Sequence, residues 1–397
     1  MKIEKISDTI TKVFFDNNKE LILVGTAHVS KDSVDEVSNL IETEKPDRLC
    51  IELDDGRLKS KTNKKTWDET DLIKVFKEGK AFLLLGNTAL ASYQKRIGMT
   101  TGVAPGSELL SAYKIAEEKG IPISLCDRNI QITLQRAWRL SNFWHKSKLL
   151  GSLISSAFSK EKVTAEELEE LKKNDTLQQM LKEMAKELPG AKKALIDERD
   201  TYLATNIYLA SGEKKLAAIG AGHAGGILKN LERLEKGEQK TDLSDISVLP
   251  PKSKGSSLVG WIVPFLIVAL IVFGAYRNGW QQGIRMFLYW AATNASFTFL
   301  FAILANAHPL NWLVAAITAP ISVLSPVLGV GIFTGIAETR LRRPTIKDYE
   351  ALGDDSLKLK GWFKNKILHA LVVFFMTSIG SILGTFVGFP VLLNLIS

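Results

Sequence analysis

Cysteine is scarce in this chain, which argues against a disulfide framework and against a cysteine-based metal site. Among 397 residues, only Cys50 and Cys126 are cysteines, and they share no spacing typical of metal ligands. Each lies in a short apolar run that predicts a buried strand. We therefore expect both to be small core residues rather than redox-active or disulfide-forming groups.

A continuous apolar segment is missing from the amino terminus. The opening stretch, MKIEKISDTITKVFF, alternates charged and apolar residues. It lacks the apolar core of a secretory signal, and we expect no such signal here. An amino-terminal domain on the outer side of a membrane would need another route.

Acidic residues are few in the last third of the chain. Residues 251–397 contain 12 Lys or Arg and 5 Asp or Glu, so they carry +7 of the formal net charge of +8. These basic residues stand in short segments between long apolar runs, a pattern typical of loops beside membrane helices. A nucleic-acid-binding protein usually gathers positive charge with aromatic residues on a folded surface, so we expect no nucleic-acid partner.

The first 250 residues predict an α/β domain. Two strands meet at the turn of residues 16–18, and the second contains the run LILVG, residues 21–25. An amphipathic helix over residues 34–41 and a strand over residues 48–53 complete a βαβ unit. The sheet therefore contains parallel strands, whose carboxyl ends meet at one edge.

The opening pattern, a strand that ends in glycine and is followed by a histidine and a helix, occurs again later in this domain. A helix over residues 107–119 and a strand over 121–127 precede a charged, helical stretch at about 130–212, which we interpret as a helical cap. The segment KKLAAIGAGHAGGI then gives a strand, a histidine and a helix, and a last strand is expected over 245–250. We therefore predict a mixed sheet with two pseudo-repeated strand-GxxH-helix halves.

Residues 251–397 predict an all-α transmembrane domain. About four hydrophobic segments approach or exceed the length needed to cross a bilayer core of about 30 Å, at 257–276, 286–305, 309–337 and 367–396. The third contains Pro320 and Pro326, so it is either one kinked helix or two short helices that form a re-entrant hairpin.

The last segment and the basic loop before it bear on assembly and orientation. Gly380, Gly384 and Gly388 form a stripe suited to close helix packing, which makes a homodimer plausible. The loop at 340–366 is rich in Lys and Arg and should be cytoplasmic. Four full spans would place the α/β domain outside, whereas a re-entrant third segment places it in the cytoplasm. We favour the cytoplasmic arrangement, in a multi-pass protein of the cell (inner) membrane.

Two histidines are expected at the same edge of the sheet. His28 follows Gly25 and His223 follows Gly220, each just after a short apolar strand, and Glu52 ends a strand as well. One such histidine alone is more often structural. Two imidazoles and a carboxylate together form a familiar catalytic metal site with open positions, so the sequence predicts a divalent ion, Mn, Co or Zn.

Such a site would need a second acid or base and a cation for a developing oxyanion. Glu198 and Arg199, on a predicted helix before the second GxxH strand, are candidates, although a solvated charged helix also explains them. Asp127 and Arg128 end another strand and fit a structural ion pair.

The order of these motifs resembles that of the TraB/PrgY pheromone-shutdown family, in the wider TraB/Tiki/GumN superfamily. The motifs that carry the resemblance are GTAHVS, IELDDGR, PGSE, DRNIQITLQRAW, IDERDTYLA and GAGHAGGI. It implies an erythromycin esterase/ChaN-like fold and a metal-dependent protease activity, as in Tiki proteins. By motif, His28 and His223 would be metal ligands, Glu52 the acidic active-site residue, and Arg199 the positive group near the substrate carbonyl.

The leading hypothesis is therefore a membrane-anchored metallopeptidase or related hydrolase that acts on a peptide. PrgY-type proteins limit the response of a cell to its own peptide pheromone, so the resemblance also implies a shutdown role. One alternative is a protein that binds or sequesters a peptide without cutting it. Another is a membrane tether or scaffold that works through its carboxyl-terminal helices.

Overall fold

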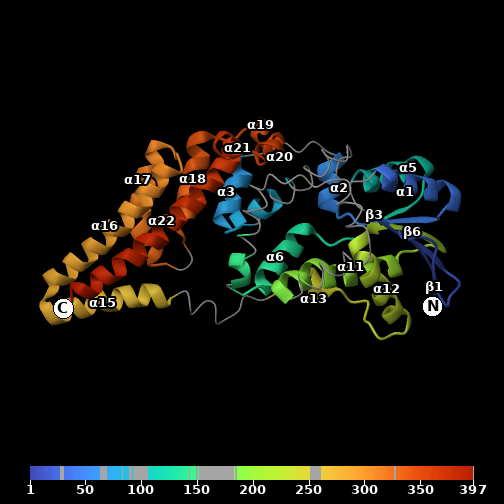
Figure 1. Ribbon diagram of the computed structural model, residues 1–397, viewed down its shortest axis with the longest axis horizontal. Helices are drawn as coiled ribbons and strands as arrows, with labels where there is room; N and C mark the ends of the chain where they lie inside the picture. The colour runs from blue at the N-terminus through green and yellow to red at the C-terminus, as the bar shows by residue number, and fades with distance from the viewer. Residues whose placement is uncertain are drawn as a thin grey trace. The chain divides into compact units, whose positions relative to one another are not determined.

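The computed structural model divides the chain into two compact units, which are described separately below (Figure 1). The α/β unit comprises Met1–Lys65 and Tyr93–Pro251, and the helical unit comprises Thr66–Ser92 and Lys252–Ser397. Residues 66–92 thus belong with the helices, although their place in the sequence suggested the first domain. The structure describes residues 1–26, 31–62, 69–82, 84–88, 92, 106–142, 144–148, 151, 183, 186–250, 261–325 and 328–396.

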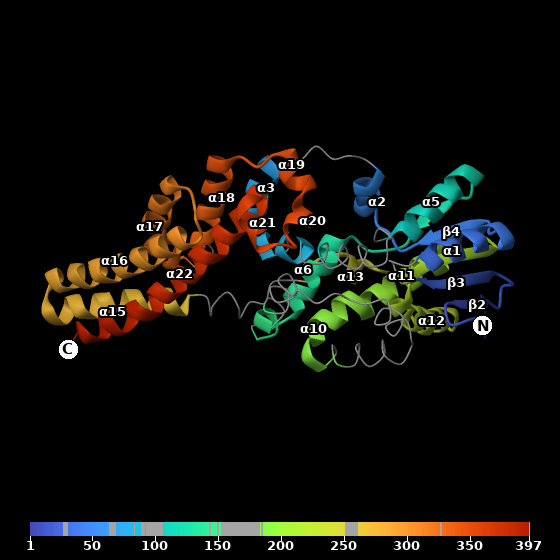
Figure 2. The ribbon, with the colours of Figure 1, turned by 45° about the horizontal axis from the view of Figure 1, so that its top comes forward.

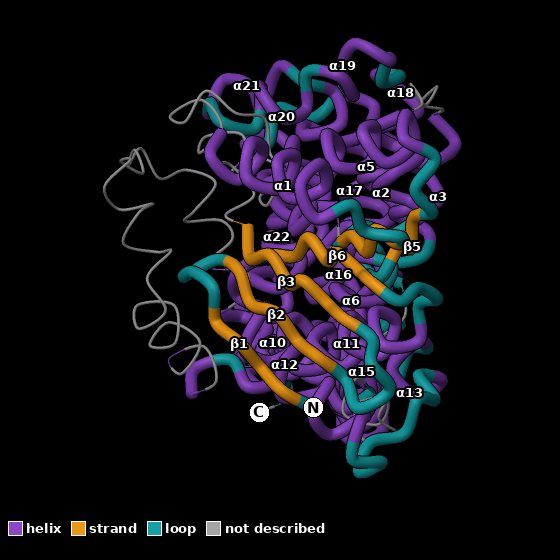
Figure 3. Tube along the Cα trace, turned by 90° about the vertical axis from the view of Figure 1, so that its right-hand side faces the viewer, coloured by secondary structure: helices purple, strands orange, loops and turns teal. Residues whose placement is uncertain are grey.

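A six-stranded mixed sheet forms the centre of the α/β unit, which confirms the predicted sheet type (Figure 3). The order is β1-β2-β3-β6-β4-β5; β1, β2 and β3 pair antiparallel, whereas β3, β6, β4 and β5 pair parallel. The strands are β1 (Lys2–Lys5), β2 (Ile10–Phe14), β3 (Glu20–Thr26), β4 (Arg48–Ile51), β5 (Ile123–Leu125) and β6 (Lys214–Gly220).

The register brings the strands of both GxxH motifs side by side. Thr26 at the end of β3 pairs with Gly220 at the end of β6, and Ile51 of β4 pairs with Ala218 of β6. Strand β6 therefore lies between the two strands that carry the other expected site residues. The central strands are apolar and buried because helices cover both faces, as parallel sheets require.

Helices pack on both faces of the sheet (Figure 2). Helices α1 (Lys31–Glu44) and α5 (Ser107–Lys119) cover one face through Val37, Ile41 and Leu109, among others. Helices α11 (Glu198–Leu209) and α12 (Ala221–Glu235) cover the opposite face. Cys50 and Cys126 are free thiols buried in the second of these cores, which confirms the expectation from sequence.

The remaining described helices of this unit are short. They are α2 (Asp55–Thr62), α6 (Ile130–Leu140), α10 (Pro189–Lys192), a π-helical turn at Lys193–Asp197, and α13 (Ser244–Ser247). The strand expected over 245–250 is wrong. Asp242 accepts a hydrogen bond from the Ser244 amide at 2.9 Å and starts a helical turn, and the Ile246 carbonyl accepts from Arg128 at 2.7 Å rather than from a strand.

The helical unit is an array of helices, as the sequence predicted for the carboxyl-terminal third. Two of them, α16 (Trp280–Leu304) and α22 (Lys366–Asn394), are long and apolar enough to cross a membrane by length and composition, and α15 (Ile262–Asn278) and α17 (Pro309–Val323) are shorter and apolar. The described helices are α3 (Glu69–Lys77), α15 (Ile262–Asn278), α16 (Trp280–Leu304), α17 (Pro309–Val323), α18 (Val330–Arg342), α19 (Ile346–Glu350), α20 (Leu352–Asp355), α21 (Leu359–Lys364) and α22 (Lys366–Asn394).

The third hydrophobic segment contains two helices rather than one kinked helix. Helix α17 includes Pro320 and ends at Val323, and α18 begins at Val330. Pro326 lies outside the described residues. At 1.5 Å per residue, α17 is about 22 Å long, which is shorter than the bilayer core.

The glycine stripe of α22 packs against α16 of the same chain. A β-carbon added to Gly384 would lie 2.8 Å from Cα of Asn294, and one added to Gly380 would lie 2.9 Å from the Phe297 carbonyl oxygen. Asn294 also donates to the Ser381 carbonyl at 3.1 Å. The stripe thus serves close packing within the chain, so it no longer supports the predicted homodimer.

We expect Gly384→Ala to lower the thermal unfolding midpoint of the purified protein in detergent. The new methyl group would meet backbone atoms of α16, and overpacking of this kind costs about 1–3 kcal/mol. Gly388→Ala is the matched control, because its β-carbon would lie 3.4 Å from Trp290 Cδ1, an ordinary contact. Equal midpoints for both variants would contradict the close approach of the two helices.

Candidate active site

Five polar side chains of the α/β unit meet at the carboxyl edge of its parallel strands. Glu52 directly follows β4, and Asp127 lies two residues beyond β5. His223 lies in the first turn of α12, directly after β6, and Arg199 and Asp200 are consecutive residues near the start of α11. The sheet topology thus assembles the cluster from segments that are far apart in sequence.

The carboxylate of Glu52 is buried and held on both sides. Its Oε2 accepts a hydrogen bond from the Gly220 amide at 2.6 Å, across the end of the neighbouring strand β6. Its Oε1 accepts from Nη2 of Arg199. The first contact fixes the carboxylate against the strand end that precedes His223.

Arg199 is the centre of the cluster. Its Nη2 and Nε donate to the two carboxylate oxygens of Asp127 at 2.7 and 3.1 Å, in addition to the contact with Glu52. Burial alone would lower the pKa of Arg199, but the charges of Glu52 and Asp127 outweigh burial and raise that pKa above its ordinary value. The guanidinium therefore stays charged at any physiological pH.

The hydrogen bonds of His223 assign its tautomer. Nη1 of Arg199 lies 3.0 Å from Nε2 of His223, and because arginine can only donate, Nε2 must be the acceptor. Nδ1 therefore carries the proton and donates to Oδ1 of Asp200 at 2.5 Å. The lone pair of Nε2 is thus directed at Arg199, and Oε1 of Glu52, which accepts from the same guanidinium, lies 3.8 Å from Nε2.

The position of the Asp200 carboxylate depends on a glycine in the second GxxH motif. Burial raises the pKa of Asp200 and outweighs the opposing effect of its hydrogen bond to His223. A β-carbon added to Gly226 would lie 1.8 Å from Oδ2 of Asp200. The glycine three residues after His223 therefore leaves room for the carboxylate that orients the imidazole.

Arg57 extends the cluster through Asp127. Its Nη2 donates to Oδ2 of Asp127, and its Nε donates to Asp54 at 2.7 Å. Asp127 is thus shared by two arginines. The sequence interpretation had paired it with Arg128, which instead lies in a different network.

Glu198, a candidate from sequence, lies apart from this cluster. Its carboxylate accepts from Nη1 of Arg128 at 2.8 Å and from Nε of Arg136 at 2.7 Å. Consecutive helix residues point about 100° apart, so Glu198 and Arg199 enter different surroundings. The Glu198 pairs join α11 to α6, and they are a structural feature rather than a part of the site.

Sequence reasoning had missed Asp200, and it had not placed Asp127 with the site. Asp127 ends a parallel strand, and that position was a usable signal. No spacing signal marks Asp200, because its partner His223 lies on another helix. It is the geometry of α11 against α12 that brings them together.

His28 lies outside the described residues. Strand β3 ends at Thr26, which pairs with Gly220 and donates to Oε1 of Glu108 at 3.4 Å. Glu108 belongs to the PGSE motif at the start of α5. Among the described residues, no group of three His, Cys, Asp or Glu side chains has the arrangement of a metal site.

Comparison with known proteins gives matches along most of the chain. The description TraB/PrgY/gumN family matches residues 9–240, and TraB family protein, C-terminal domain matches residues 255–397. An uncharacterized protein of Methanocaldococcus jannaschii is 32% identical over 378 residues, which are 93% of this chain and 94% of that protein.

Two mammalian proteins are also similar. The TraB domain-containing protein of Bos taurus is 28% identical over 306 residues, which are 68% of this chain and 76% of the relative. That of Homo sapiens is 27% identical over 305 residues, 68% and 77% of the two chains.

We expect the Glu198 pairs to make stability sensitive to acid. Burial would raise the pKa of Glu198, but Arg136 and Arg128 outweigh it and lower that pKa below the ordinary 4.5. A lowered folded-state pKa means that the stabilisation is complete above about pH 4.5 and is lost as the pH falls through the folded value.

Glu198→Gln should therefore unfold at a lower temperature than the wild type at pH 7, by the equivalent of about 3 kcal/mol. The difference should shrink as thermal unfolding is repeated from pH 5 to pH 3. Glu118→Gln, at an exposed position on α5, is the control and should follow the wild type. A constant difference across this range would contradict the assignment.

Proposed function

The chain belongs to the TraB/PrgY/gumN family, and from this premise we propose that its α/β unit is a metal-dependent hydrolase that cuts peptides. The observation that carries the proposal is the pair of His223 and Glu52. Asp200 holds the proton of His223 on Nδ1, so that Nε2, which accepts from Arg199 in this structure, would be the ligand atom beside a buried carboxylate once an ion replaced that hydrogen bond. A histidine that ligates a metal usually donates its other N–H in this way.

The donor set fits a divalent ion. Nε2 of His223 and Oε1 of Glu52 lie 3.8 Å apart, and Arg199 donates to both atoms, so an ion held by the two residues would take over the position of that cation. His28, two residues after the end of β3, would supply another donor. A neutral imidazole and a carboxylate suit Mn, Co or Zn.

When bound, such an ion would lower the pKa of a water molecule towards neutrality. The residues of the chain supply the other functions. The carboxylate of Glu52 can accept a proton from an attacking water, and Arg199, whose charge is permanent, can donate to the oxygen of a substrate carbonyl. Asp127 and Arg57 position Arg199 for this contact.

We further propose that the helical unit anchors the protein in the cell membrane. Helices α16 and α22 have the required length and composition. Large apolar side chains are exposed along them, including Leu288, Leu304, Ile382 and Phe386. Lipid would cover such a surface, whereas water would not favour it.

A re-entrant hairpin of α17 and α18 would place the α/β unit in the cytoplasm. If α17 and α18 re-enter the membrane as a hairpin, then α15, α16 and α22 are the full spans. This arrangement puts the α/β unit and the basic loop at 340–366 on the same side, and basic loops are cytoplasmic. A peptide in the cytoplasm is then the substrate class, with a peptide signal as one member.

The hydrolase proposal predicts that two substitutions stop cleavage without unfolding the protein. Glu52→Gln removes a proton acceptor and His223→Ala removes a ligand, so each should lower cleavage of a quenched fluorescent peptide library by about 100-fold or more. His223→Ala should also lose metal, as measured by plasma mass spectrometry after loading with Mn, Co or Zn.

His145→Ala, which alters a histidine outside the cluster, should keep both activity and metal. If wild type binds library peptides but mass spectrometry finds them uncut with each metal, the protein sequesters peptides and the hydrolase proposal is wrong. Unchanged cleavage by His223→Ala would have the same consequence.

The orientation can be read from cysteine labelling, because both native cysteines are buried. Asn278→Cys, at the end of α15, should react with an impermeant maleimide in intact cells, since it would face outside. Lys347→Cys, in the basic loop, should react only after permeabilisation. The reverse pattern would place the α/β unit outside.

A further inference from the structure

The two edges of the sheet differ in chemistry. Strand β1, at one edge, has the sequence KIEK, and all four of its residues are exposed. Charged residues of this kind discourage another strand from pairing. Strand β5, at the opposite edge, has the sequence ISL and carries no charge. Of the two edge strands in the described part of the chain, only β5 lacks charges that would discourage a further strand.

The outer backbone groups of β5 point away from the sheet. In the ladder with β4, the Leu49 amide donates to the Pro122 carbonyl and the Cys126 amide donates to the Ile51 carbonyl. Because hydrogen bonding alternates along a strand, Ile123 and Leu125 turn their N–H and C=O groups outward. Within the described chain, β4 is the only strand that pairs with β5.

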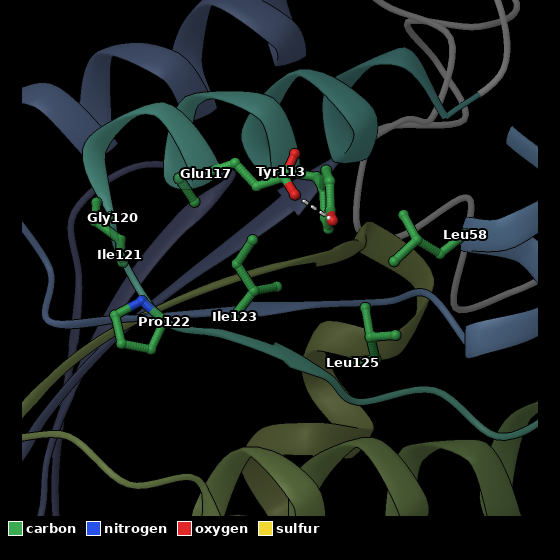
Figure 4. A pocket seen from close by; sticks show the side chains of 9 residues that line it. Leu58, Tyr113, Glu117, Gly120, Ile121, Pro122, Ile123 and Leu125 are labelled. Carbon is green, nitrogen blue, oxygen red and sulfur yellow. Dashed lines mark hydrogen bonds between the residues drawn. The ribbon is translucent and has the colours of Figure 1, made fainter. Parts of the chain in front are cut away.

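A groove lies beside this edge. Its lining comes from helix α5 and from the β5 segment, where Ile123 and Leu125 are alternate residues of the strand, with Leu58 of α2 near one end (Figure 4). The cavity volume is about 460 Å³, within the range that holds small ligands. Most of the lining is apolar, and Glu117 stands in it as a polar group that accepts from Tyr113 at 2.7 Å.

The groove ends next to the candidate active site. Leu125 lines the groove and Asp127, two residues later, pairs with Arg199. Leu58 also lines it, and the preceding residue, Arg57, pairs with the same aspartate. A chain laid along β5 would therefore reach the edge that holds Glu52 and Arg199.

We propose that the β5 edge binds an extended peptide by strand addition, with alternate apolar side chains in the groove. Backbone hydrogen bonds to Ile123 and Leu125 supply affinity, and the groove supplies a preference for apolar residues at every second position. If the bound peptide is a substrate on its way to the catalytic edge, then this proposal rests on the proposed hydrolase function. Binding itself does not require cleavage.

The test uses the full-length Glu52→Gln variant in detergent, because this variant should not cleave the probe. The probe is a fluorescein-labelled peptide of ten alternating Val and Thr residues with a Lys at each end, and binding is followed by fluorescence anisotropy. Ile123→Lys should weaken binding about tenfold or more, because it replaces an apolar lining side chain of the groove with a charge and removes about 1–2 kcal/mol of apolar contact. Ile3→Lys places the same substitution on the other edge and should leave binding unchanged.

Two methylated probes distinguish strand addition from simple groove binding. N-methylation of every second amide removes the donors on one side of the peptide. Methylation of one set should abolish binding, and methylation of the alternate set should leave it intact. Hydrogen exchange should slow over residues 121–127 when the unmethylated probe is present.

Three results would overturn the inference: no binding of the probe, equal effects of the two lysine substitutions, or equal binding of both methylated probes. These outcomes are separate from those of the hydrolase. If the wild type cuts library peptides and Ile123→Lys cuts them equally well, only the strand addition is refuted. Binding with the predicted pattern but no cleavage by the wild type would refute only the hydrolase.

Discussion

The buried charge of Arg199 is the constraint on which the site depends. A buried guanidinium is costly unless carboxylates surround it, and here Glu52, Asp127 and the imidazole of His223 all contact it. Two of these partners follow strand ends and the third lies on α12, whereas Arg199 itself lies on α11. The charge compensation therefore requires the whole parallel sheet to be in register, and it links the chemistry of the site to the fold.

Buried charges are also paired elsewhere in the α/β unit. Glu198 lies between Arg128 and Arg136, so the acidic and basic residues of DERD and DRNIQITLQRAW form two separate networks. One network joins α11 to α6 and stabilises the unit. The other faces the edge of the sheet, where its groups can also contact a substrate.

Polar contacts also hold the helical unit together. Glu338 is fully buried and contacts Arg342, His369 at 3.1 Å and Asn311 at 2.8 Å. These contacts join α17, α18 and the start of α22. Buried apolar clusters surround these polar contacts, and large apolar side chains are also exposed on α17 and α22, so polar residues are a minority inside the unit.

The sequence by itself determined the mixed sheet and the two similar strand ends, because hydrophobic period and glycine position are local signals. It also placed Glu52, His223 and Arg199 among the site candidates. Tertiary structure alone decided that Glu198 faces the other network, that Asp200 orients His223, and that the glycine stripe packs within the chain. Each of these depends on which helix faces which neighbour, and residue spacing along a single chain does not encode that.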